Sequence, residues 1–200
     1  MIANYFIAIF ISYLIGSIPN GLLLGKAIWH VDLRKYGSHN IGATNAWRTI
    51  DKTAGITIFV ADLLKGVLSV YIASLLSPVP LAMILAGIFA IIGHSVSIFL
   101  GFKGGKGVAT GLGVLIMLMP SVSAFVFVVW LIVVLISKYV SLGSIVAAAL
   151  VPISAYVIGL QKEYVIFGII AAIFVIYRHK ANIIRLIHGK ENKIKAGHRS

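Results

Sequence analysis

Long apolar runs alternate with short polar segments along the 200 residues of the chain. A helix that spans a bilayer requires about 20 apolar residues. Four runs are close to this length: Tyr5–Leu24, Ala54–Leu76, Val79–Leu100 and Leu142–Leu160. A fifth run, Val165–Tyr177, is shorter, but a helix there can continue toward Ile187 if Arg178 and Lys180 extend to the interface. The pattern predicts an all-α, polytopic membrane protein, with a single domain over residues 1–200.

The run Val108–Ile136 forms either one crossing or two. Its 29 residues would make a helix of about 43 Å, too long for one crossing and short for two, and Pro120 stands near its middle. With one crossing, the basic tail that begins at Arg178 and the basic loop Lys26–Lys52 lie on opposite sides of the membrane. With a turn at Pro120, all Lys and Arg residues except Lys162 lie on one side.

The positive-inside rule, by which Lys and Arg gather on the cytoplasmic side of a membrane, favours the turn at Pro120. We therefore predict seven transmembrane helices, with the N-terminus outside and the C-terminus in the cytoplasm. We expect the two short helices on either side of Pro120 to thin the bilayer locally or to cross it at only part depth.

Composition narrows the class of protein. Hydrophobic residues make up 60% of the chain and charged residues 11%, with a mean hydropathy of +1.05, whereas a soluble domain has about 25% charged residues. The net charge of +12 would suggest a nucleic-acid partner for a soluble protein, but here the basic residues border the membrane, so we expect no nucleic-acid partner.

Cysteine is absent, which excludes a disulfide and a thiol nucleophile. The first run lacks a basic start and a cleavage site, and is read as a retained helix.

Three polar segments share the predicted cytoplasmic face. The first, YGSHNIGATNAWR, lies within the loop Lys26–Lys52 and has no acidic residue. Its Ser, Thr, Asn and Gly residues favour turns and nests whose backbone N–H groups converge on an anion, and Arg48 adds a guanidinium suited to phosphate or carboxylate. Taken alone, the segment is better explained as an ordinary loop with capping residues before the next helix.

The second segment, GFKGGKGVATG at residues 101–111, separates two runs without charged residues. It is not a Walker A loop, because Gly107 follows Lys106 where that motif has Ser or Thr. Gly104 and Gly105 would nevertheless let the backbone approach a ligand closely, while Lys106 and the N-terminus of the next helix supply positive charge. An anion site and a pair of lysines that flank a membrane helix explain this segment about equally well.

The third segment, YRHKANIIRLIHGKEN, ends the last predicted helix. On a helix His179 and Asn182 lie on one face, with Arg178 and Arg185 close by and Glu191 just beyond. Interfacial basic residues and a structural histidine would explain this segment if it stood alone. Because three such segments share one face, we expect one cationic pocket for a phosphate. The sequence has no carboxylate cluster, GxSxG elbow or HExxH motif, so we expect no metal.

Two charged residues interrupt the run Ala54–Leu76. Asp62 and Lys65 are three residues apart on one helical face, which favours a structural ion pair, because an unpaired charge within a membrane is costly. His94 lies near the cytoplasmic end of its helix, and we expect it to face the same cavity as the polar segments.

Together these features resemble the bacterial acyl-phosphate-dependent glycerol-3-phosphate acyltransferases, the PlsY family. The resemblance rests on GSIPNGLLLG, DLRKYGSHNIGATNAWR, DLLKG at Asp62–Gly66, GH at Gly93–His94, FKGGKGVATGLG and RHKANIIRLIHGKE, in the family's order and spacing. His39 departs from it, since a small residue is more usual there. The resemblance implies transfer of an acyl chain from acyl-phosphate to the sn-1 hydroxyl of glycerol-3-phosphate. It also implies a cytoplasmic (inner) membrane enzyme whose active site faces the cytoplasm, with no cofactor or obligatory protein partner.

The resemblance implies roles for the polar residues. The expected catalytic residues are His179, Asn182, Ser38 and Arg48. The expected substrate-binding residues are Asn40, Thr44, Asn45, Lys106, Gly104, Gly105, Arg178 and Arg185. Asp62, Lys65, His94 and Glu191 are expected to have structural or supporting roles. The hydroxyl proton would pass to a phosphate oxygen of the substrate, with His179 as the alternative base.

A small transporter or channel for phosphate-bearing anions would use a similar basic cavity. Transporters usually show an internal repeat and polar groups near the middle of the bilayer. Here the two halves of the sequence show no similarity, and the predicted outer face has few polar residues. These features favour an enzyme.

Overall fold

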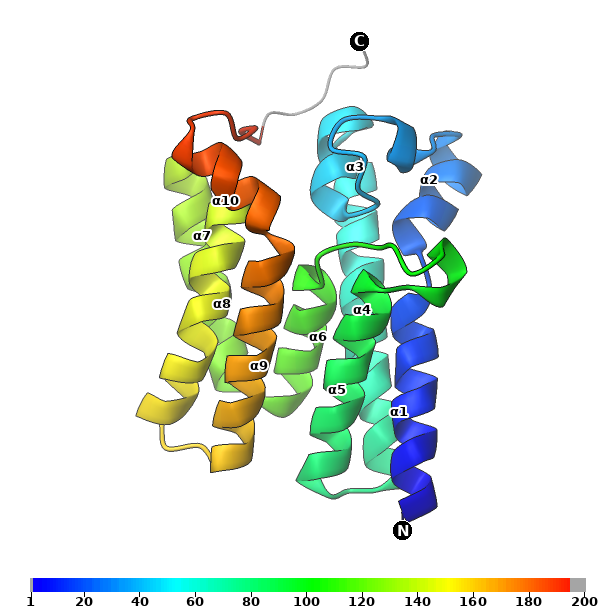
Figure 1. The fold of residues 1–200 in the computed structure, drawn as a ribbon, viewed down its shortest axis with the longest axis vertical. Helices are drawn as coiled ribbons and strands as arrows, with labels where there is room; N and C mark the ends of the chain where they lie inside the picture. Colours follow the sequence, from blue (N-terminus) through cyan, green and yellow to red (C-terminus); the bar gives the residue numbers. More distant parts are fainter. Residues whose placement is uncertain (1, 195–200) are drawn as a thin grey trace.

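The computed structural model describes residues 2–194, and the regular structure in this range is helical. The helices are α1 Ile2–Ser17, α2 Asn20–Trp29, α3 Ala43–Thr49, α4 Lys52–Leu76, α5 Pro80–Ser95, α6 Val108–Leu118, α7 Pro120–Ser137, α8 Val140–Val157, α9 Lys162–Arg178 and α10 Lys180–Ile187, with 3₁₀ turns η1 Leu33–Lys35 and η2 Ile98–Leu100. Most helices stand side by side along the long axis of the molecule (Figure 1). The N-terminus lies at one end of this bundle, and α2, α3 and α10 lie at the other. Residues 195–200 of the predicted basic tail lie outside the described residues.

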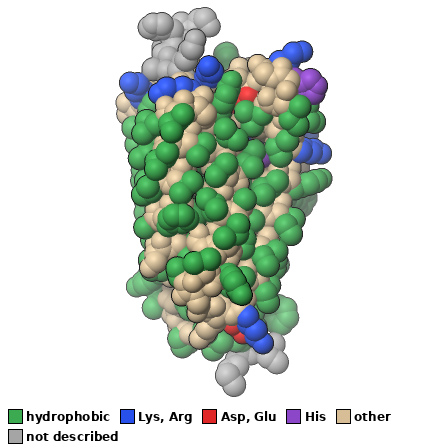
Figure 2. Space-filling view, turned by 90° about the vertical axis from the view of Figure 1, so that its left-hand side faces the viewer, with side chains coloured by type: hydrophobic (Ala, Val, Ile, Leu, Met, Phe, Trp, Pro, Cys, Tyr) green, Lys and Arg blue, Asp and Glu red, His purple; other side chains and the backbone are tan. Residues whose placement is uncertain are grey.

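The outer surface of the bundle is apolar, as a protein in hydrocarbon requires. Large hydrophobic side chains are exposed on several helices, among them Phe6, Phe10, Ile136 and Tyr156. Figure 2 shows hydrophobic side chains along the length of one face, with Lys and Arg near its ends. Five helical segments are long and apolar enough to cross a membrane, or six if the bent pair α9–α10 is one span. The prediction of an all-α chain with several spans is confirmed.

The predicted count of seven spans depends on α6. This helix has 11 residues, which make about 16 Å of helix against a hydrocarbon core of about 30 Å. It ends at Leu118 and α7 begins at Pro120, so the predicted turn at Pro120 is present. Figure 1 shows that α6 begins lower in the bundle than the point where α7 ends and α8 begins. The segment Gly101–Gly107 therefore runs into the bundle, and α6 can be only a partial crossing.

The first predicted span is interrupted, and this corrects the continuous helix expected over Tyr5–Leu24. Helix α1 ends at Ser17 and α2 begins at Asn20, because Pro19 has no N–H to continue the ladder. The Ile18 carbonyl exposed by this break accepts hydrogen bonds from the Asn20 N–H at 3.0 Å and from Lys65 Nζ at 2.9 Å. Lys65 also pairs with Asp62 at 3.0 Å. The predicted ion pair therefore exists, and it supports the break in the neighbouring helix.

The last predicted helix is also interrupted. The axes of α9 and α10 differ by 60°, with His179 between them. The His179 N–H donates to the carbonyls of Val175 and Ile176, which ends α9. Helix α10 then crosses the end of the bundle (Figure 1), with Ile187 77% exposed. The predicted continuation of the helix toward Ile187 is therefore present only as a bent pair, with His179 at the bend and Asn182 beyond it in α10.

Glycine sets how closely α6 approaches α4. A Cβ at Gly113 would lie 2.0 Å from the carbonyl oxygen of Leu63, and one at Gly66 would lie 2.2 Å from that of Thr110. Real Cβ atoms do not approach so closely, so only glycine permits this spacing. The contact fixes α6, whose first residue follows the glycine-lysine segment.

Candidate active site

A cavity of about 200 Å³ lies between the loop before α3, helices α4 to α9 and the segment after α10. Most of the predicted site residues line it: Ser38, Asn40, Thr44, Asn45, Arg48, Asp62, His94, Lys106, His179, Asn182, Arg185 and Glu191. The structure thus brings all three polar segments together at one end of the bundle. Four predicted residues do not line the cavity: Gly104, Gly105, Arg178 and Lys65.

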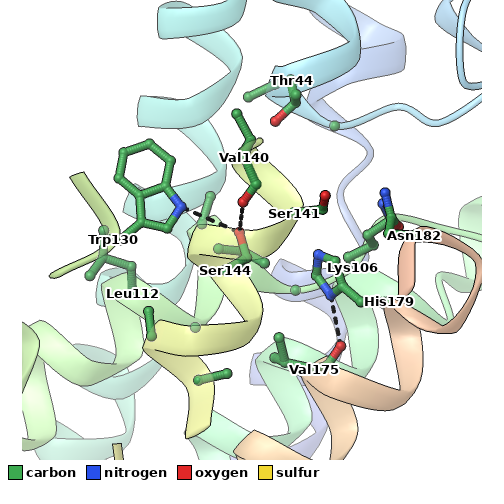
Figure 3. Close-up of a pocket in the computed structure, with 18 of the residues that line it drawn as sticks. Thr44, Lys106, Leu112, Trp130, Val140, Ser141, Ser144, Val175, His179 and Asn182 are labelled. Atoms are coloured by element: carbon green, nitrogen blue, oxygen red, sulfur yellow. Dashed lines mark hydrogen bonds between the residues drawn. The ribbon is translucent and has the colours of Figure 1, made fainter. Parts of the chain in front are cut away.

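Lys106 is held in the cavity by a chain of hydrogen bonds. Its Nζ donates to Oδ1 of Asn182 at 2.6 Å, and Nδ2 of Asn182 donates to Oε1 of Glu191 at 2.7 Å. The Asn182 amide therefore accepts from a cation and donates to an anion, which fixes its orientation. Figure 3 shows Lys106, His179 and Asn182 pointing toward one another in the cavity.

The Glu191 carboxylate anchors this chain of hydrogen bonds. Besides Asn182, Ser141 Oγ donates to it at 2.9 Å and Arg185 Nε donates at 2.7 Å. Burial would raise the pKa of Glu191, but hydrogen bonds from Asn182, Arg185 and Ser141 outweigh burial and hold that pKa below its ordinary value. Glu191 is therefore ionised at neutral pH, and it ties the segment after α10 to α8.

Arg48 extends from α3 to the segment after α10. Its Nη2 donates a hydrogen bond to the carbonyl of Asn192. Its Nε is buried and has no hydrogen-bond partner among residues 2–194. A buried donor without a partner is costly, so this guanidinium is suited to bind an anion within the cavity.

His179 presents one ring nitrogen to the cavity. Its Nδ1 lies 2.8 Å from the carbonyl oxygen of Val175, and the side chain is buried (Figure 3). A carbonyl oxygen can only accept, so Nδ1 carries the hydrogen and a neutral ring has a lone pair on Nε2. That nitrogen can accept a hydrogen bond from a hydroxyl group in the cavity.

Asn45, which lies in the first turn of α3, fixes the conformation of the loop before this helix through hydrogen bonds. Its Nδ2 donates to the carbonyls of Leu33, Tyr36 and Asn40 at 3.1, 3.1 and 2.8 Å. Its Oδ1 accepts from the Ser38 N–H at 3.0 Å. The Asn45 side chain is therefore occupied by the loop itself, and it fixes the backbone that carries Ser38 and Asn40.

The structure accounts for His39, which stands where a small residue is more usual in the family. Its backbone has a φ of 55°, in the left-handed region where glycine is favoured. Its Nδ1 lies 3.0 Å from the carbonyl oxygen of Arg34. This local hydrogen bond helps the loop to hold a larger residue at that position.

The backbone of Gly104 and Gly105, which we expected to approach a ligand, contacts other parts of the protein instead. The Gly105 N–H donates to the His94 carbonyl at 3.0 Å. The carbonyls of Gly104 and Gly105 accept hydrogen bonds from Arg178 Nη2 at 3.3 and 2.9 Å. These glycines and Arg178 thus bind one another, and their direct contact with a substrate stays a prediction.

The deeper half of the cavity is apolar and lies between α6, α7, α8 and α9. Small side chains widen it, among them Ala147, Ala148, Ala171 and Ala172. A second hollow of about 300 Å³ between α4, α6 and α7 shares Phe59, Leu112 and Phe127 with this cavity. The polar end of the site is therefore continuous with an apolar groove, which the sequence alone did not assign to particular helices.

Several lining residues were missed at the sequence level: Ser141, Ser144, Trp130 and Asn192. Ser144 Oγ accepts from Trp130 Nε1 at 3.3 Å and donates to the Val140 carbonyl at 2.9 Å (Figure 3). The available signal was the spacing of Ser141 and Ser144, which places two hydroxyl groups on one face of α8 near its basic end.

The cavity is electrostatically cationic. Burial, together with the charges of Arg185, Arg48 and Arg178, lowers the pKa of Lys106 to about 8, although Glu191 opposes the change. The ammonium group thus has fewer water molecules and more cations around it than an exposed lysine. A bound anion would relieve both effects, since it adds negative charge beside Lys106.

A sequence model of the glycerol-3-phosphate acyltransferase family matches residues 6–189. The chain is 44% identical over 191 residues to glycerol-3-phosphate acyltransferase of Fusobacterium nucleatum subsp. nucleatum, covering 96% of this chain and 98% of that protein. It is 48% identical over 188 residues to that of Carboxydothermus hydrogenoformans, covering 94% and 95%. The crystal structure of PlsY, an integral membrane glycerol 3-phosphate acyltransferase, in its glycerol 3-phosphate form has a TM-score of 0.90 at 38% identity, covering 96% of each chain. Its lysophosphatidic acid form has a TM-score of 0.88.

The pKa of Lys106 predicts how anion binding depends on pH. Below about 8 the side chain is charged and would attract phosphate; as the pH rises through this value the charge is lost. From pH 8 to pH 9 we expect the affinity for inorganic phosphate to fall by about fivefold to tenfold, measured by calorimetry in detergent. A Lys106→Arg variant, whose charge persists, should show no such fall. An equal fall in both proteins would contradict the assignment.

Proposed function

The chain belongs to the glycerol-3-phosphate acyltransferase family, and on this premise we propose that it transfers an acyl group from acyl-phosphate to the sn-1 hydroxyl of glycerol-3-phosphate. The products are 1-acyl-glycerol-3-phosphate, a lysophosphatidic acid, and inorganic phosphate. One observation carries the proposal: a single cavity joins a cationic end around Lys106 and Arg48 to an apolar groove. Such a cavity suits reactants that carry both phosphate and hydrocarbon.

The cationic end is suited to both phosphates of the proposed reaction. Lys106 and Arg48 bind phosphate oxygens, and Ser38, Asn40 and Thr44 add hydrogen bonds from the loop that Asn45 holds. Asn182 and Arg185 complete the opposite wall, where Glu191 orients them. Arginine and lysine stabilise the negative charge that develops on the leaving phosphate, which is the largest contribution that such a site makes to rate.

The acyl chain of the donor occupies the apolar groove between α6, α7, α8 and α9. The alanines of α8 and α9 leave space for a hydrocarbon chain. The hollow between α4, α6 and α7 adjoins this groove, since the two share Phe59, Leu112 and Phe127. A chain held there places its reactive end beside Lys106.

His179 orients the attacking hydroxyl group. Its Nε2 accepts a hydrogen bond from the hydroxyl group, while Nδ1 is fixed by the Val175 carbonyl. The hydroxyl oxygen bonds to the acyl carbon, the bond from that carbon to the phosphate oxygen breaks, and the departing phosphate takes the proton. Because phosphate is a good leaving group, proximity and charge stabilisation suffice, and no covalent acyl-enzyme is required.

The enzyme is an integral membrane protein, and we propose that its active site faces the cytoplasm. The site lies at the end of the bundle that carries α2, α3 and α10, opposite the N-terminus (Figure 1). Lysines and arginines are numerous in the loops and tail at that end, whereas Lys162 begins α9 at the other end. The positive-inside rule then places the N-terminus outside.

The choice of donor is tested with purified protein in detergent. We expect acyl-phosphate and glycerol-3-phosphate to give equal amounts of acylated product and released phosphate, and acyl-CoA and acyl-carrier protein to give none. Lys106→Ala should lower kcat/KM by about 100-fold or more, because it removes a charge-stabilising group. Product formation with the thioesters alone would overturn the proposed donor.

The role of His179 is tested by His179→Gln and His179→Ala. Glutamine places an acceptor oxygen near the position of Nε2 but cannot serve as a base at neutral pH. If His179 only orients the hydroxyl, the Gln variant should keep kcat within about tenfold of the native enzyme, while the Ala variant loses about 100-fold or more. Equal and severe losses in both variants would instead show that His179 is the base.

The proposed orientation is tested by cysteine labelling, which the absence of native cysteine makes simple. Phe102→Cys and His188→Cys mark the active-site end, and Gln161→Cys marks the other end; all three positions are exposed. In intact cells a membrane-impermeant maleimide should label only Gln161→Cys, and permeabilisation should expose the other two. Labelling of Phe102→Cys and His188→Cys from opposite sides would refute the proposed topology.

A further inference from the structure

We propose that Arg178 is a positioning residue, which holds the backbone of Gly104 and Gly105 so that Lys106 reaches the phosphate end of the cavity. This inference rests on the proposed function, because it concerns the segment that would bind phosphate. From the sequence, Arg178 is expected to bind substrate directly. The structure instead directs its guanidinium to the protein backbone, outside the lining of the cavity.

The segment that carries Lys106 cannot fix its own conformation. Residues 103–106 form neither helix nor strand, and the adjacent Gly104 and Gly105 give the backbone wide conformational freedom. On one side, Arg178 Nη2 donates to the carbonyls of Gly105 at 2.9 Å and Gly104 at 3.3 Å. Two successive carbonyls are thus held by one charged donor, which restricts both residues at once.

The opposite side of this segment rests on His94. The His94 carbonyl accepts the Gly105 N–H at 3.0 Å. A Cβ at Gly105 would lie 2.0 Å from Nε2 of His94, so the ring fills the space that a side chain would need. Gly105 is therefore enclosed between His94 and Arg178. The close contact with His94, rather than contact with a ligand, explains why glycine is required here.

The two helices that meet at the bend between α9 and α10 each contribute a residue that holds the Lys106 segment. Arg178 ends α9 and holds the backbone before Lys106, whereas Asn182 of α10 binds the ammonium group at 2.6 Å. His179 lies between them and faces the cavity. A straight helix would place these three side chains differently, so the 60° bend is what separates the positioning residue from the residues that contact substrate.

A double-mutant cycle tests this role, because a residue that acts through Lys106 has no effect once Lys106 is gone. We expect Arg178→Gln to lower kcat/KM by about 10-fold to 100-fold in the native background. In a Lys106→Ala background it should change kcat/KM by less than about twofold. Lys103→Gln removes the same charge from an exposed position of this segment, and it should leave kcat/KM within about twofold of the native value in both backgrounds.

Other roles for Arg178 give different results. If Arg178 bound substrate directly, its effect would multiply with that of Lys106→Ala, and the proposal would be overturned. If it only stabilised the fold, Arg178→Gln would lower activity by a similar factor in both backgrounds. Arg178→Lys, taken through the same cycle, gives the answer should the Gln variant fail to fold.

The same four proteins of the double-mutant cycle can also be compared by their affinity for inorganic phosphate, a measurement that requires no acyl donor. If acyl-phosphate proves to be the wrong donor, Arg178→Gln should still weaken phosphate binding in the native background and not in Lys106→Ala. Loss of phosphate affinity by the same factor in both backgrounds would overturn the positioning role, whichever donor the enzyme uses.

Discussion

Backbone carbonyls that are left open inside a bilayer must find donors within the protein, because hydrocarbon offers none. In this chain cationic side chains meet that requirement. Lys65 donates to the Ile18 carbonyl where the first helix breaks, and Arg178 donates to the carbonyls of the glycine pair beside Lys106. Each irregular segment can therefore lie within the bundle instead of at its end. The geometry of the site depends on these bonds, since those from Arg178 hold the non-helical backbone that leads to the lining residue Lys106.

The cavity carries more cationic than anionic side chains, since Arg48, Lys106 and Arg185 line it beside Asp62 and Glu191. Its two lining carboxylates are already engaged, Asp62 with Lys65 and Asn20, and Glu191 with Arg185, Asn182 and Ser141. Arg48 has only a backbone carbonyl as partner, with one buried donor unused. Burial prevents water from compensating this charge fully, which is why the pKa of Lys106 falls to about 8. An anionic reactant would supply the missing negative charge, and in the proposed reaction both reactants are anionic.

Much of this arrangement could be predicted from the sequence, and the reason is physical. Apolar runs reveal spans, and the distribution of Lys and Arg brought the polar segments to one face, where the structure has them. The break at Pro19 also carried a signal in the sequence, but the high hydropathy of that run concealed it. The bend at His179 could not be predicted, because no proline or glycine lies next to it in the sequence. Asn45 was assigned to substrate because a polar side chain in a loop gives no sign of whether its partners are internal.

The short helix α6 connects the two halves of the site. A helix of full length before the Pro120 turn would carry the preceding residues to the end of the bundle, away from the apolar groove. With 11 residues, α6 instead starts within the bundle, so Lys106 lies just before the lining residues Leu112 and Leu115. The cost is a non-helical segment within the bundle, which Arg178 and His94 support. The partial crossing is thus the feature that joins the cationic end of the cavity to its apolar groove, and the proposed acyl transfer between a soluble and a lipid reactant would use both.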